Sequence, residues 1–296
     1  MTFKNQKMSD SRRTFIKQIG LATAGAALLP YFGCNQTKEF GIQLYSLREE
    51  IPKDLENVIS QIAKAGYSYV EGFGFSDKNG YFGLTSEKFK ALLDKYQLTS
   101  PSSHFDFGDW EKTQDDSILK SYIASAKVLK QEYVTIPYIN PAIFKTVEGS
   151  KSFAQKVNRA SKIVKDAGLK LAYHNHDIEF FDLNGTTGYD ILLQETDPNL
   201  VDFEMDLYWV VKAKKDALKY FETYPGRFTM WHVKDMRKSD VTLNTEIGNG
   251  MIDFKKIFAK AKLAGLKYPI VEQENFEINP FDSITKSAAV MNVISN

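Results

Sequence analysis

Five polar residues each stand at the end of an apolar, strand-like segment of this chain. They are His104, His174, Asp206, His232 and Glu272. Carboxylates and imidazoles are costly to place beside buried strands unless another group compensates them. If these strand ends converge at one edge of a sheet, a divalent metal ion and a polar substrate are the partners that fit best. The pattern therefore favours an enzyme.

Eight segments with strand character carry or flank these residues, and a helical pattern separates each from the next. The predicted strands span 40–45, 68–73, 98–104, 132–138, 169–175, 200–206, 227–234 and 268–274. Their starts recur at intervals long enough for a strand, a helix and two short loops. We therefore expect a single domain from residue 35 to residue 296.

The apolar spacing between the strands predicts individual helices. Pro52 is expected to open one helix, Val58 and Ile62 to lie on its buried face, and Gly66 to end it. The same scheme recurs before Gly168 and before Gly265.

Eight strand–helix units in one domain predict a (β/α)8 barrel. The alternative is a doubly wound open sheet, but no G-x-G-x-x-G turn follows the first predicted strand. In a barrel the active site lies at the carboxyl ends of the strands, which is where the five polar residues fall.

Three of these residues come from consecutive strands and can form a metal site. Asp206, His232 and Glu272 end the sixth, seventh and eighth predicted strands, and His174 ends the fifth. A mixed set of oxygen and nitrogen ligands suits one divalent ion, with Mn²⁺, Mg²⁺ or Co²⁺ preferred over Zn²⁺. No thiolate is expected at this site.

The order of motifs along the chain resembles the sugar phosphate isomerase/epimerase family. These xylose-isomerase-like barrels include ketose 3-epimerases, hydroxypyruvate isomerase and inosose dehydratase. The similarity extends from residue 40 to about residue 280. It rests on GIQLYSLR, YVEGF, SSHFD, YHNHDIEF, EMDLYW, HVKD with the later EIGNGMIDF, and YPIVEQEN.

The resemblance implies metal ligands at the ends of the last four strands, which are Glu, Asp, His and Glu in this family. Asp206, His232 and Glu272 match the last three. His174 stands where the first glutamate is expected, as in the inosose dehydratase branch, and Glu179 is the alternative fourth ligand. Trp209 replaces a histidine of many relatives and either stacks on a sugar or caps the barrel.

The resemblance also implies proton abstraction next to a sugar carbonyl through a cis-enediolate, with the metal stabilising the developing charge. Glu272 and Glu274 are the candidate bases, although Glu274 could instead orient a ligand. Lys234 is a candidate for holding an oxyanion or protonating a leaving group. The alternative role of Lys234 is an ion pair with Asp235 or Glu246. Substrate contacts are expected from His104, Glu71, His176, Trp209 and Arg237.

Isomerisation or epimerisation of a sugar is the expected reaction. If the enolate carries a leaving group at its β carbon, the same first step leads to elimination from a keto-sugar or 3-keto-glycoside, so a lyase or dehydratase is the alternative. A non-catalytic periplasmic sugar binder could stack sugars on Trp110, Trp209 and Trp231, but it would not need the carboxylate and imidazole set. A family-2 abasic-site endonuclease needs more histidines than the four present.

Residues 1–34 have the pattern of an export signal. A twin-arginine motif from Ser11 to Lys17 precedes an apolar run from Ile19 to Leu29, which is too short to span a bilayer. Cys34 is the only cysteine, so an intrachain disulfide is excluded. It stands where a lipidated cysteine would lie, and lipid-anchored and unanchored forms are both open. We expect twin-arginine export to the periplasm, with membrane contact only through such an anchor.

The charge of the chain bears on its partners. The whole chain has a net charge of +1, and its first 33 residues hold five basic side chains and one acidic side chain. The remainder is therefore mildly acidic. Without a basic run to neutralise phosphates, nucleic-acid binding is not expected. A small-molecule sugar or glycoside is the expected partner.

Overall fold

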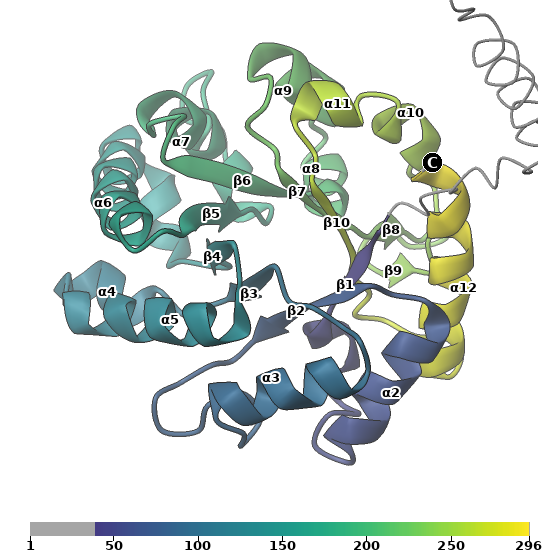
Figure 1. The fold of residues 1–296 in the computed structure, drawn as a ribbon. Helices are drawn as coiled ribbons and strands as arrows, with labels where there is room; N and C mark the ends of the chain where they lie inside the picture. Colours follow the sequence, from purple (N-terminus) through teal and green to yellow (C-terminus); the bar gives the residue numbers. More distant parts are fainter. Residues whose placement is uncertain (1–38, 296) are drawn as a thin grey trace, which may run out of the picture. The chain divides into compact units, whose positions relative to one another are not determined.

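Eight parallel strands form a closed barrel in the computed structural model, which describes residues 39–295 (Figure 1). The strands are β1 (Gly41–Gln43), β2 (Tyr69–Phe73), β3 (Ser102–His104), β4 (Tyr133–Ile136), β5 (Lys170–His174), β6 (Val201–Asp206), β7 (Met230–Val233) and β10 (Tyr268–Val271). Their order around the barrel is β1-β10-β7-β6-β5-β4-β3-β2. The predicted (β/α)8 barrel is confirmed, and the open sheet is excluded because β1 pairs with both β2 and β10.

Helices cover the outside of the barrel and connect its strands (Figure 1). They are α2 (Leu55–Ala65), α3 (Ser86–Lys95), α4 (Gly108–Thr113), α5 (Asp116–Leu129), α6 (Val147–Asp166), α7 (Gly188–Glu195), α8 (Leu207–Lys212), α9 (Ala217–Thr223), α10 (Phe254–Phe258), α11 (Ala261–Ala264) and α12 (Pro280–Ile294). Short 3₁₀ turns span Leu44–Leu47, Pro141–Lys145 and Ile178–Phe180. No helix within residues 39–295 is both long enough and apolar enough to cross a membrane.

The boundaries of α2 follow from its end residues and differ from the prediction at one end. The helix begins at Leu55 rather than at Pro52, because the Asp54 side chain accepts a hydrogen bond from the Asn57 amide. It ends at Gly66, whose φ of 94° favours glycine, as predicted. Val58 and Ile62 are buried against the barrel.

An antiparallel hairpin follows β7 and was not predicted. It consists of β8 (Asp235–Met236) and β9 (Asn244–Thr245). The Asp235 carboxylate organises the loop beyond it by accepting hydrogen bonds from the amides of Met236, Gly248, Gly250 and Ile252. A Cβ atom at Gly250 would lie 2.1 Å from Asp235 Oδ1, so a larger residue would push this carboxylate aside.

The predicted export signal of residues 1–34, including the twin-arginine motif and Cys34, lies outside the described residues. Residues 39–295 belong to one compact unit of the chain. The barrel itself therefore holds every other residue for which a functional role was predicted.

Candidate active site

Barrel closure brings the polar strand ends together at the carboxyl end of the barrel. Asp206 on β6 is paired in register with His232 on β7, and His174 on β5 is paired with Glu204 on β6. Glu204 and Asp206 are two residues apart, so both side chains point to the same side of their strand. The residues form two groups that could hold a metal ion, and His232 belongs to both.

The first group, called here the outer group, consists of Asp206, His232 and Glu272. Their ligand atoms lie within 4.8 Å of one another, and all three residues are buried. Asp206 Oδ1 accepts a hydrogen bond from the Trp209 amide at the start of α8. Asn175 Oδ1 accepts one from the Asp206 amide. Local structure on both sides therefore holds the Asp206 backbone in place.

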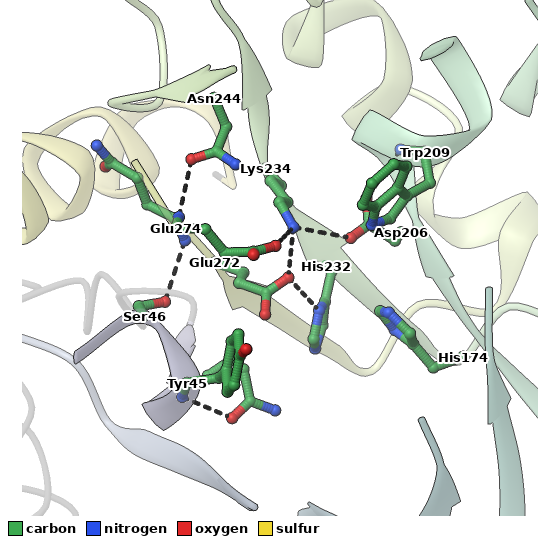
Figure 2. A network of polar contacts seen from close by, with 12 residues as sticks. Tyr45, Ser46, His174, Asp206, Trp209, His232, Lys234, Asn244, Glu272 and Glu274 are labelled. Atoms are coloured by element: carbon green, nitrogen blue, oxygen red, sulfur yellow. Dashed lines mark hydrogen bonds and ion pairs between the residues drawn. The ribbon is translucent and has the colours of Figure 1, made fainter. Parts of the chain in front are cut away.

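Lys234 lies among the carboxylates of the outer group (Figure 2). Its Nζ is 3.1 Å from Glu272 Oε2 and 3.9 Å from Asp206 Oδ2, and it also contacts Glu274 Oε1. These contacts replace the ion pair with Asp235 or Glu246 that was considered from the sequence. The ammonium is fully buried and compensates part of the negative charge.

The second group, called here the inner group, consists of His104, His174, Glu204 and His232. Glu204 Oε2 lies 2.6 Å from His104 Nε2, 3.1 Å from His174 Nδ1 and 3.4 Å from His232 Nε2. Glu204 is fully buried, and its strand supplies no cation. The ion-pair partners of Glu204 among the described residues are these three imidazoles.

Glu71 contacts His232, the residue that the inner and outer groups share. Its Oε2 accepts a hydrogen bond from Gln43 Nε2 at 2.8 Å and lies 2.7 Å from His232 Nε2. A carboxylate on one ring nitrogen fixes the orientation of an imidazole whose other nitrogen faces a metal position. His232 Nδ1 faces Glu272 Oε2 at 3.2 Å, so the ring lies between Glu71 and the outer group.

Burial and charge set the pKa values of the outer group in opposite directions. Burial raises the pKa of Asp206 to about 7, although Lys234 works against this shift. Burial also opposes the charge of Glu272, yet Lys234 and His232 outweigh it and hold its pKa well below the usual range. Burial lowers the pKa of Lys234, but Glu272 and Asp206 reverse the effect and raise it above its ordinary value.

The inner group shows the same competition. Burial, with the nearby charge of Glu71, raises the pKa of Glu204 to about 7. Burial disfavours the ionised form of Glu71 as well, but His104 and His232 outweigh it and lower its pKa to about 2. Burial lowers the pKa of His174 well below its ordinary value, so this imidazole is neutral at pH 7.

A cavity of about 430 Å³ opens above both groups. Such a volume suits a small ligand. Its lining residues are Tyr45, Phe73, Gly74, His104, Asp106, Pro137, Tyr138, His174, His176, Trp209, Glu272 and Glu274. The cavity therefore joins aromatic walls to carboxylates and imidazoles at its base.

The structure places six of the predicted site residues on the cavity wall and positions the others elsewhere. Four others lie behind this wall, among the charged residues of the outer and inner groups: Glu71, Asp206, His232 and Lys234. Arg237 pairs with Glu277 at 2.6 Å and does not line the cavity. Glu179 accepts hydrogen bonds from the Tyr173 hydroxyl and the His176 amide and joins neither metal-capable group. Trp110 and Trp231 are fully buried, so they cannot stack on a ligand, whereas Trp209 can.

Glu204 is the residue that sequence reasoning missed. It stands two positions before Asp206, and the alternation of a strand points both side chains into the barrel. That spacing was a usable signal. Gln43, Asn175 and Asn244 were missed too; Asn244 Oδ1 accepts hydrogen bonds from the amides of Glu274 and Asn275.

The outer group fits a divalent ion. Asp206 Oδ2 is buried and has no hydrogen-bond partner among the described residues, although it faces the cluster. An unpaired carboxylate oxygen in this position is costly unless a cation compensates it. One imidazole and two carboxylates form a donor set suited to Mn²⁺, Mg²⁺, Co²⁺ or Zn²⁺.

Comparison with known proteins adds independent findings. A family model described as "Xylose isomerase-like TIM barrel" matches residues 59–292. The crystal structure of a sugar phosphate isomerase/epimerase from Parabacteroides distasonis is similar, with a TM-score of 0.76 and 30% sequence identity. The alignment covers 88% of this chain and 95% of that one.

Two inosose dehydratases are similar in sequence. The enzyme of Clostridium perfringens is 32% identical over 124 residues, which are 36% of this chain and only 41% of that protein. The enzyme of Mesomycoplasma hyopneumoniae is 24% identical over 265 residues, which are 78% of this chain and 86% of that protein. The similarity to the second enzyme extends across most of the barrel.

Proposed function

Because this chain belongs to the xylose isomerase-like TIM barrel family, we propose that it is a metal-dependent sugar isomerase or epimerase. The reaction would begin with abstraction of a proton next to a carbonyl group of the sugar. The observation that carries the proposal is the pairing of Lys234 with Glu272 and Glu274 at the base of the cavity. A candidate base and a cation would thereby act beside the same space.

Glu274 is the better candidate for the base. Glu272 belongs to the outer group, whereas Glu274 lines the cavity without joining either metal-capable group. The carboxylate would take the proton, the electron pair of the C–H bond would form the enediolate double bond, and the carbonyl oxygen would take the negative charge. If the proton returns to the former carbonyl carbon and the proton of the adjacent hydroxyl moves to the former carbonyl oxygen, the sugar is isomerised. If it returns to the opposite face of the same carbon, the sugar is epimerised.

A divalent ion held by Asp206, His232 and Glu272 would supply charge stabilisation at the developing oxyanion. His174 and Glu179 were the fourth ligands predicted from the sequence, and neither belongs to the outer group. Trp209 would place its indole against the sugar, beside His176 at a ring-centre distance of 5.3 Å.

The cavity favours a sugar without a phosphate group. Its lining residues in the described part of the chain include Asp106, Glu272 and Glu274 but neither arginine nor lysine. Arg48 donates to the carbonyl oxygens of Tyr45 and Glu274 and is not among the lining residues. A phosphate dianion would meet these carboxylates with no arginine or lysine among the lining residues to bind it, so a neutral keto-sugar or glycoside fits better.

Elimination is the second candidate function, and the similarity to inosose dehydratases favours it. The first proton transfer would be the same. A hydroxyl or glycosidic oxygen on the β carbon would then leave with the electron pair, and Lys234 would be the candidate to protonate it. Product analysis separates the two outcomes, because elimination releases water or an alcohol whereas isomerisation conserves the mass of the sugar.

Deuterium exchange tests the shared first step. The protein would be incubated with keto-sugars and 3-keto-glycosides in D₂O, with and without a chelator. Metal-dependent deuterium uptake next to the carbonyl would support the proposal. A sugar that binds without any exchange would indicate the non-catalytic binder.

Export is a separate part of the proposal and rests on the leader sequence alone. Arg12 and Arg13 would direct the protein to the twin-arginine route, and the mature chain would begin near Cys34. Changing both arginines to lysine should leave the protein in the cytoplasm. Periplasmic arrival of that variant at the normal level would contradict the assignment, and mass spectrometry of the mature chain would show whether Cys34 carries lipid.

A further inference from the structure

The inner group has features that a single ion in the outer group does not explain. Three imidazoles from β3, β5 and β7 surround one carboxylate oxygen, Glu204 Oε2, at 2.6 to 3.4 Å. The other oxygen, Glu204 Oε1, is buried and has no hydrogen-bond partner among the described residues. A fully buried carboxylate with one unpaired oxygen calls for a cation close to it.

The total charge of the outer and inner groups and their charged neighbours also indicates a need for a further cation. Lys234 is the one ammonium group that contacts these groups within the described chain. The carboxylates of the cluster are Glu71, Glu204, Asp206, Glu272 and Glu274. With all five ionised and the imidazoles neutral, one divalent ion together with Lys234 leaves two negative charges uncompensated in a largely buried region, and such an excess is strongly unfavourable. A second divalent ion would balance it.

We propose that the inner group binds a second divalent cation, through His104 Nε2, His174 Nδ1 and the Glu204 carboxylate. This inference goes beyond the proposed function, which requires one ion only. Two imidazoles with one carboxylate form a donor set for metals of borderline softness, such as Zn²⁺, Co²⁺ or Fe²⁺. The outer group is richer in oxygen, so the two positions differ in their metal preference.

His232 separates the two positions. Its Nδ1 faces the outer group, 3.2 Å from Glu272 Oε2, while its Nε2 faces Glu71 at 2.7 Å. With Nδ1 facing a metal, Nε2 carries the proton and donates it to Glu71. His104 and His174 also line the cavity, so the second ion would have an open side toward the substrate.

Metal stoichiometry tests the proposal directly. The purified chain would be stripped with a chelator, loaded with Zn²⁺ or Co²⁺ alone, dialysed, and measured by elemental analysis. We expect two ions per chain in the unchanged protein, one in Glu204→Gln and one in Asp206→Asn. Glu132→Gln, which alters a carboxylate at the opposite end of the barrel, is the matched control and should retain both ions.

Cobalt spectroscopy identifies which position each variant loses. Glu204→Gln should remove the visible absorption of the ion with two imidazole ligands, while Asp206→Asn should leave that absorption in place. If Glu204→Gln does not fold, as judged by circular dichroism, His104→Gln at the cavity edge makes the same test and should also lose one ion.

Three results would overturn the inference: one ion in the unchanged protein, two ions in both Glu204→Gln and His104→Gln, or loss of the same ion in Glu204→Gln and Asp206→Asn. In each case protonated imidazoles would be the counter-charges of Glu204. Failure of the proposed function shows itself separately, as an absence of deuterium exchange in protein that is fully loaded with metal.

Discussion

The two ends of the barrel contain the same kinds of charged residues in opposite environments. At the amino end, Glu132 pairs with Lys267 at 2.8 Å, and both side chains are one third to one half exposed. At the carboxyl end, Lys234 pairs with Glu272 at 3.1 Å, and both are almost completely buried. At similar contact distances, the charge–charge interaction therefore differs in strength between the two pairs, because water screens the first pair and not the second.

The interior of the barrel near the amino end is closed by tyrosines rather than by charges. The rings of Tyr69 and Tyr268 meet edge to face at 5.6 Å, and those of Tyr133 and Tyr268 at 6.2 Å. Their hydroxyl groups donate to Pro269 O, Asp202 and Glu132, so each of the three hydroxyl groups has a partner. The carboxyl end instead leaves one oxygen of Glu71, Glu204 and Asp206 unpaired. Among the described residues, the buried carboxylate oxygens without a partner therefore lie at the carboxyl end, where a bound cation could compensate them.

The largest expected effect concerns the candidate base. Glu274→Gln removes basicity and keeps the shape of the side chain, so deuterium exchange should fall by about 10²–10⁴-fold. Metal content, measured by elemental analysis, should not change, because Glu274 joins neither metal-capable group. Glu132→Gln at the other end should retain full exchange. Near-full exchange in Glu274→Gln would transfer the role of base to Glu272.

The next effect concerns the buried and exposed ammonium groups. Lys234→Ala leaves several buried carboxylates without their cation and should lower the free energy of unfolding by about 3–5 kcal/mol. Lys267→Ala removes a half-exposed partner and should cost at most about 1 kcal/mol. Urea unfolding of both variants in metal-free buffer makes the comparison. Equal losses would show that burial does not distinguish the two ends.

A third prediction concerns pH. Burial raises the pKa of Glu179 to about 7, above the usual value of a glutamate, so the folded state favours its protonated form. Its stabilising contribution is therefore fully present below pH of about 4.5 and is lost as the pH rises to about 7. Glu179→Gln keeps a neutral side chain, so its stability relative to the unchanged protein should increase over this window.

Urea unfolding between pH 4 and pH 8 measures this difference. A flat difference would mean that Glu179 is ionised in the fold at all these pH values. Loss of bound metal in the same variant would instead identify Glu179 as the fourth ligand.

At the amino end, the pH dependence of stability has the opposite sign, because the pKa of Glu132 is lowered. Burial works against this shift, but Lys267 and Tyr268 outweigh it. Its contribution is lost as the pH falls.

The smallest effect is expected for the exposed pair itself. A double-mutant cycle with Glu132→Gln and Lys267→Ala should give a coupling free energy below about 1 kcal/mol. The coupling should weaken at high salt, where exposed charges are screened. A coupling that persists in concentrated salt would mean that this pair is shielded from solvent more than its exposure indicates.

The sequence by itself determined the barrel and most of the residues at its carboxyl end. Regular alternation of strand and helix patterns predicted the eight units, and the polar residues at strand ends predicted where a site would lie. Asp206, His232 and Glu272 could be placed together because parallel strands carry their carboxyl ends to the same edge. These inferences need only local periodicity and the common direction of the strands.

Only the tertiary structure decided which of these groups touch. Closure of the barrel brings Glu71 on β2 to His232 on β7, although they are 161 residues apart in sequence. The register of β5 against β6 places His174 opposite Glu204, a residue that the sequence did not single out. Contacts across a closed barrel depend on the stagger of all its strands, and no local pattern in the sequence records that stagger.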